Sequence, residues 1–156
     1  MLRPLLLLFV SAVVLLGQKY TGPQPEKADL PYIIHADSLV PTEALEAKEE
    51  TRKDEIVYVI EGATSSAATP LASPAFLVRV EELAPDKLEI YKLESKSGHR
   101  EILFSRKRKQ IARPVQCTVS RVGESLFKLE VDQSLEKGEY SITPNGSNTV
   151  FCFRVY

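Results

Sequence analysis

The sequence is poor in the residues and motifs that usually carry chemistry. Its 156 residues include no tryptophan, two cysteines and two histidines. No GxSxG, P-loop, HExxH or CxxC motif occurs. These motifs mark serine hydrolases, nucleotide hydrolases, zinc proteases and thiol redox enzymes, so their absence argues against those classes. A non-local acid–base site around His35 or His99 is the catalytic alternative that is left.

Metal and nucleic-acid binding are equally without a signal. No group of Asp, Glu, His and Cys has the spacing of metal ligands, and the acidic residues of 43–55 have the pattern of solvated charge. The 20 basic and 21 acidic residues give a net charge of -1, and basic residues are not interleaved with aromatic ones. We therefore predict no catalytic residue, no metal, no cofactor and no nucleic-acid partner.

The N-terminal segment 1–20 has the pattern of a secretory signal peptide. A single Arg3 precedes an apolar run over 5–16. That run is shorter than the roughly 20 apolar residues of a membrane-spanning helix. Because the cleavage site is a poor match, an uncleaved anchor is the alternative, and it is the only predicted contact with a membrane. Either way we predict a secreted or periplasmic protein of the cell envelope.

Export bears on the two cysteines, Cys117 and Cys152. An oxidising compartment would permit a disulfide between them. In their expected strands, however, Cys117 lies on the apolar side and Cys152 shares a side with Arg154. A bridge would then need neighbouring strands or a bulge, and the alternative is that Cys117 is a small buried hydrophobic residue.

Residues 21–55 are predicted to form a lead-in or linker. Four prolines and little periodicity indicate an extended or disordered chain over its first half. From Thr42 the composition turns to Glu, Ala, Leu and Lys, with Thr42 as a suitable N-cap, which predicts a short helix over 42–55. The alternative, which we favour, is that the same charge run is a solvated face or linker.

Residues 56–156 have the rhythm of an all-β domain. Short runs with alternating apolar residues are separated by Gly, Pro, Asn and Ser. The runs are 56–60, 75–80, 88–93, 101–105, 115–122, 126–131, 140–143 and 150–156. The sequence therefore predicts an antiparallel β-sandwich of about seven strands.

Leu135 and Gly138 precede Tyr140 at the start of one of these runs. The pattern resembles the tyrosine corner of immunoglobulin-like and fibronectin type III-like sandwiches. There the Tyr hydroxyl bonds a backbone group and the Gly permits a tight turn, so the resemblance implies structural roles for these residues. The missing tryptophan and the positions of the cysteines depart from antibody-type domains. The resemblance thus implies an immunoglobulin-like sandwich of a generic kind.

A basic loop is the sharpest chemical feature of this domain. The basic residues are Arg106, Lys107, Arg108, Lys109 and Arg113. Clustered positive charge attracts polyanions such as acidic glycans, although it also occurs on solvated hairpin tips. We predict a non-catalytic binding, docking or structural module whose partner is an unknown protein or an acidic glycan. The alternatives are a cell-envelope enzyme and a polyanion-binding domain that uses this loop.

Overall fold

The computed structural model describes residues 19–53, 55–105 and 112–156, and within them the chain is all β, as predicted. The described residues contain thirteen strands, a single 3-10 turn (η1, Pro85–Lys87) and no α-helix. The strands are β1 Tyr32–His35, β2 Ser38–Pro41, β3 Glu43–Glu46, β4 Lys48–Arg52, β5 Glu55–Glu61, β6 Ala68–Thr69, β7 Ala75–Arg79, β8 Leu88–Ser95, β9 His99–Ser105, β10 Cys117–Arg121, β11 Leu126–Val131, β12 Gly138–Pro144 and β13 Thr149–Val155.

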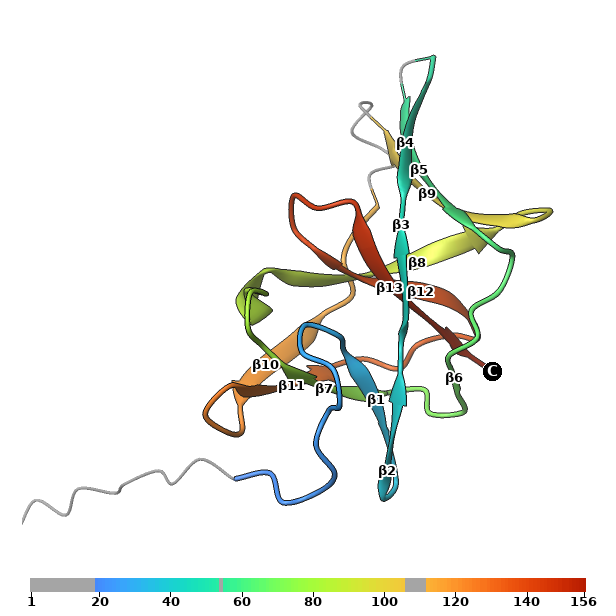
Figure 1. The fold of residues 1–156 in the computed structure, drawn as a ribbon. Helices are drawn as coiled ribbons and strands as arrows, with labels where there is room; N and C mark the ends of the chain where they lie inside the picture. Colours follow the sequence, from blue (N-terminus) through green and yellow to red (C-terminus); the bar gives the residue numbers. More distant parts are fainter. Residues whose placement is uncertain (1–18, 54, 106–111) are drawn as a thin grey trace, which may run out of the picture.

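The strands form two sheets. The smaller sheet has the order β10-β11-β7-β1-β2 and is antiparallel throughout. The larger sheet has the order β3-β13-β12-β8-β9-β5-β4, with β6 added in parallel to β13. Only Ala47 separates β3 from β4, and Figure 1 shows these two strands in line. Because β3 pairs with β13 and β4 pairs with β5, the larger sheet closes on itself like a barrel.

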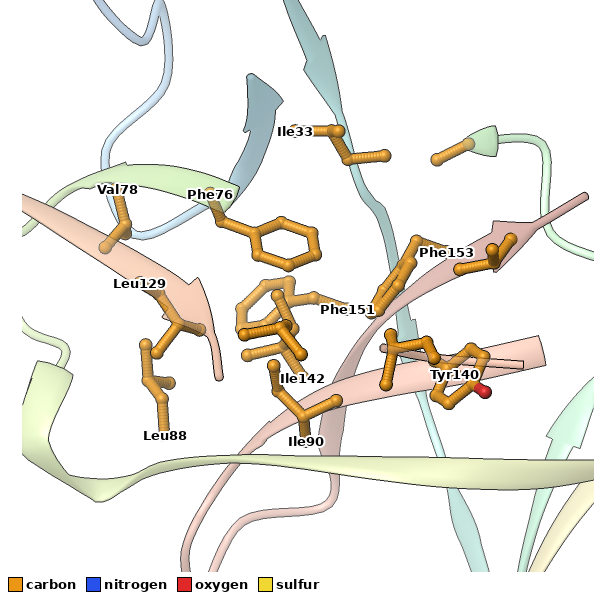
Figure 2. Packing of buried hydrophobic residues seen from close by; sticks show 14 residues of the cluster. Ile33, Phe76, Val78, Leu88, Ile90, Leu129, Tyr140, Ile142, Phe151 and Phe153 are labelled. Atoms are coloured by element: carbon orange, nitrogen blue, oxygen red, sulfur yellow. The ribbon is translucent and has the colours of Figure 1, made fainter. Parts of the chain in front are cut away.

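The main core lies between the two sheets, as expected for a sandwich. Phe76 of the smaller sheet packs against Phe153 of the larger one, with ring centroids 4.8 Å apart, and Tyr140 stacks on Phe153 at 5.4 Å (Figure 2). The predicted alternation along the last strand is confirmed, because Phe151, Phe153 and Val155 all face this core.

A second, smaller core occupies the other face of β8 and β13. It consists of Ala47, Ile60, Leu93, Ile102, Val150 and Cys152, with five partly buried residues around it. β8 and β13 are therefore buried on both faces, and β3, β4, β5 and β9 enclose the second core.

The predicted helix over 42–55 is wrong, because the segment forms β3 and β4. Alternate residues contact the interior of the larger sheet: Leu45 and Ala47 join the second core, and Glu49 bonds Tyr58. Strand pairing with β13 and β5 thus outweighs the local helix propensity of Glu, Ala and Lys.

The predicted linker over 21–55 and the domain start at residue 56 are also wrong. β1 and β2 belong to the smaller sheet, and β3 and β4 belong to the larger one. The sandwich accordingly has more strands than the seven predicted, since four of its strands precede residue 56.

Cys117 and Cys152 are free thiols in the structure. Cys117 begins β10 of the smaller sheet, whereas Cys152 lies in β13 of the larger sheet and is fully buried in the second core. The structure therefore contains no disulfide between them, which leaves the alternative of two unpaired thiols.

The corner residues have the contacts that their pattern predicts. The Tyr140 hydroxyl donates a hydrogen bond to the carbonyl oxygen of Glu136 at 2.8 Å. Leu135 is buried in the main core, and Gly138 begins β12. These residues lie where the chain passes from β11 of the smaller sheet to β12 in the middle of the larger sheet.

Candidate functional site

A cleft of about 400 Å³ opens into the second core. It is lined by residues of β4, β5, β8, β9 and β12 and by the turn 144–148 before β13. The floor is apolar because Ile60, Ile102 and Val150 of the second core lie there. We call this feature the aromatic cleft.

Three aromatic side chains give the cleft its character. Phe104 lies between Tyr58 and Tyr91, with ring centroids 5.6 Å and 5.5 Å away and ring planes inclined at 87° and 77°. Such edge-to-face contacts hold each ring in a defined position. Strand register explains the grouping: the residue opposite Phe104 on β5 is Ile56, two positions before Tyr58, so these side chains share one face. The cleft thus has preformed aromatic walls.

Two carboxylates are tied to these tyrosines. The Tyr58 hydroxyl donates to Glu49 at 2.8 Å, and the Tyr91 hydroxyl donates to Glu89 at 2.7 Å. The hydrogen bond to Glu49 and then burial raise the pKa of Tyr58. For Tyr91, burial first and then the bond to Glu89 raise the pKa well above its ordinary value. Both phenols therefore stay protonated at neutral pH and act as donors to their carboxylates.

The mouth of the cleft is polar. Asn145, Gly146, Ser147 and Asn148 form the exposed turn between β12 and β13. The buried Ser141 and the half-buried Thr143 add hydroxyls of β12 to the lining. Among the described residues that line the cleft, no side chain is basic, and the two charged ones are carboxylates. An apolar floor with a few polar groups at the rim is typical of a site for a small ligand.

A buried ionic cluster lies at the other end of the second core. Arg100 is fully buried, and its guanidinium donates to the carbonyl oxygens of Gly62 and Glu61, both at 2.8 Å. It also donates to Glu43 at 3.0 Å and lies 3.6 Å from Glu139. Its partners belong to β3, to β12 and to the end of β5. The cluster therefore joins the strands that enclose the second core to the sandwich, which is a structural role.

The basic residues predicted as a polyanion site are only partly described. Arg106, Lys107, Arg108 and Lys109 lie outside the described residues. Arg113 is exposed and lines a second cavity of about 500 Å³ together with Lys92, which is paired with Glu136. Polyanion binding by this set stays a prediction.

The two histidines lie away from both of these cavities. His99 contacts Glu101 at 3.2 Å, beside the exposed Arg52, and His35 ends β1 at a hairpin. Neither lines either cavity. In the described ranges no three Asp, Glu, His or Cys side chains are grouped so as to hold a metal ion.

Sequence reasoning missed the residues of the aromatic cleft. Tyr58, Tyr91 and Phe104 all lie in predicted strands, but the sequence pattern does not place them on a shared face. A signal was present, since Ile56–Ile60 is apolar on both sides and such a strand must be covered twice. Which strands supply the second cover is a non-local property.

Comparison of the chain with protein-family models, with curated proteins and with solved structures finds no match. Over the part of the chain that the structure describes, no helix is long and apolar enough to span a bilayer. The fold and the cleft are therefore the observations on which a function can be argued.

Proposed function

We propose that the protein is an exported, non-catalytic binding module of the cell envelope and that the aromatic cleft is its ligand site. The observation that carries this proposal is the cleft itself, with three mutually fixed aromatic rings over an apolar floor. Its volume of about 400 Å³ lies within the usual range of small-ligand pockets. That the protein is exported is inferred from the signal-peptide pattern of residues 1–20.

The scaffold that we propose is an immunoglobulin-like sandwich with an insertion. The order β1-β7-β11-β10 corresponds to strands A-B-E-D of that fold, and β13-β12-β8-β9 corresponds to G-F-C-C′. The tyrosine corner at the start of β12 supports the same alignment. In antibody domains a cysteine follows this tyrosine by two residues, and here the fully buried Ile142 has that position.

In this alignment β2 to β6 are an insertion between the first two sandwich strands. The insertion supplies Glu49 and Tyr58, while the sandwich strands supply Glu89, Tyr91 and Phe104. The proposed site thus lies where the insertion covers the outer face of the G-F-C-C′ sheet. Additions of this kind allow one fold to serve many functions.

Titration with N-phenyl-1-naphthylamine, a neutral fluorophore that brightens in apolar surroundings, tests the proposed site. Wild-type protein is expected to bind this probe saturably. Asn148→Trp places a large ring at the exposed mouth of the cleft and is expected to abolish binding. Ser97→Trp, in the exposed turn between β8 and β9, adds the same ring elsewhere and is the matched control.

Thermal melts of both variants show whether the folds are intact. Loss of binding in Asn148→Trp alone supports the cleft as the site. An equal response of the two variants, or a wild-type protein that does not bind the probe, contradicts it.

Export is tested separately. Cells that express the full chain are fractionated, and the N-terminus of the mature protein is sequenced. We expect the protein outside the cytoplasm, with cleavage near residue 20.

A further inference from the structure

We propose that the aromatic cleft binds a small organic cation, namely an amine or a quaternary ammonium compound with an apolar body. This inference rests on the proposed function of the cleft and adds the chemical class of its ligand. The sign of the charge is the first argument. Glu49 and Glu89 line the cleft, and no Lys, Arg or His is among the described residues around it. A cation is therefore complementary to the two carboxylates of the described lining.

The aromatic walls are the second argument. A cation is attracted to the electron-rich face of an aromatic ring, and boxes of several rings recognise quaternary ammonium groups. Tyr58, Phe104 and Tyr91 form a continuous group of three rings at nearly right angles. An apolar body bound among these rings would also be removed from water by Ile60 and Val150 on the floor.

The two Tyr–Glu hydrogen bonds are the third argument. A phenol that donates to a carboxylate becomes more electron-rich, and this strengthens the attraction of its ring for a cation. Both tyrosines of the cleft are polarised in this way, at 2.8 Å and 2.7 Å. Glu89 is half-buried, so its negative charge is incompletely hydrated and gains from a neighbouring positive charge. Glu49 is exposed at the mouth, where it can attract an approaching cation.

A pair of isosteric probes separates charge from shape. Choline carries a trimethylammonium group, and 3,3-dimethylbutan-1-ol has the same outline with carbon in place of the charged nitrogen. In calorimetric titrations at pH 7 and low salt, choline is expected to bind at least about tenfold more tightly than the alcohol. Raising the ionic strength should weaken choline binding and leave the alcohol unaffected.

Charge removal inside the cleft provides the matched variants. Glu89→Gln keeps an acceptor for the Tyr91 hydroxyl but removes the negative charge, and it is expected to lower choline affinity by about tenfold with no effect on the alcohol. Glu94→Gln lies on the same strand, where Glu94 is exposed and pairs with Lys96, and is expected to change neither titration. Equal losses in both variants would contradict a specific role for the cleft carboxylate.

The outcomes distinguish this inference from the proposed function. If choline and the alcohol bind equally, or if neither binds while N-phenyl-1-naphthylamine does, the cleft is a binding site but the cation inference is wrong. If none of the three probes binds, both proposals fail. If N-phenyl-1-naphthylamine binds, choline binds better than the alcohol and only Glu89→Gln removes that preference, both stand.

Discussion

At the scale of single residues, Arg100 is a charged side chain that is completely removed from solvent. Its side chain is fully buried and bonds two carbonyl oxygens and the Glu43 carboxylate. Removing one partner of a buried ion pair leaves the other charge without compensation. Arg100→Met is therefore expected to lower the free energy of unfolding by about 3–5 kcal/mol, as measured by urea denaturation.

Arg52 is the control for this prediction. It also pairs with two glutamates, Glu50 and Glu101, but its side chain is 45% exposed. Arg52→Met is expected to cost much less, because water replaces the lost partner at an exposed site. Similar losses in the two variants would show that burial of Arg100 does not set its contribution.

Tyr140 offers a second prediction at this scale. Tyr140→Phe keeps the stack on Phe153 and removes the hydroxyl that donates to Glu136. The expected loss in urea-denaturation free energy is about 0.5–1.5 kcal/mol, the usual contribution of one hydrogen bond. Tyr156→Phe, at an exposed position, is the control and should be neutral. A neutral Tyr140→Phe would mean that the corner bond does not stabilise the fold.

At the scale of elements, Asp29 fastens the segment before β1 to the loop after β7. Its carboxylate accepts hydrogen bonds from the backbone N–H groups of Glu81, Glu82 and Leu83. Burial raises the pKa of Asp29, but these backbone bonds together with Arg79 outweigh burial and lower the pKa below its ordinary value. A lowered pKa means that the ionised form is preferred in the folded state.

This shift predicts a pH dependence with a defined sign. The carboxylate stabilises the fold above the unfolded-state pKa of about 3.9, and the contribution is lost as pH falls through the lower folded-state value. Asp29→Asn suits the positive φ of 56° at this position, because Asn tolerates it. In urea denaturation at pH 2 to 7, the variant should be less stable near neutrality and approach wild type in acid. A constant difference would contradict the assignment.

At the scale of the whole molecule, two strands unite the two cores. β8 and β13 each bury one face in the main core and the other face in the second core. Opening the second core alone would expose one face of these central strands, so we expect both cores to unfold in a single transition. Cys152 reports on this, because it is fully buried and burial raises its pKa to about 12.

In Cys117→Ser protein, labelling of Cys152 by a thiol reagent in increasing urea should follow the loss of circular dichroism. In wild type the half-buried Cys117 should react first. Labelling of Cys152 at urea concentrations that leave the circular dichroism unchanged would show instead that β3, β4 and β5 open independently of the sandwich.

The sequence by itself determined the longer strands from residue 56 onward, but not the two-residue β6, and it determined the corner at Tyr140. It could do so because alternation and turn residues act over a few neighbouring positions. It predicted only one covered face for β13, where Phe151, Phe153 and Val155 point inward. Tertiary structure decided that residues 43–52 form strands and that Arg100 is buried. It also decided that Tyr58, Tyr91 and Phe104 lie together. Each of these depends on pairing between segments far apart in the chain, and that pairing overrides local propensity.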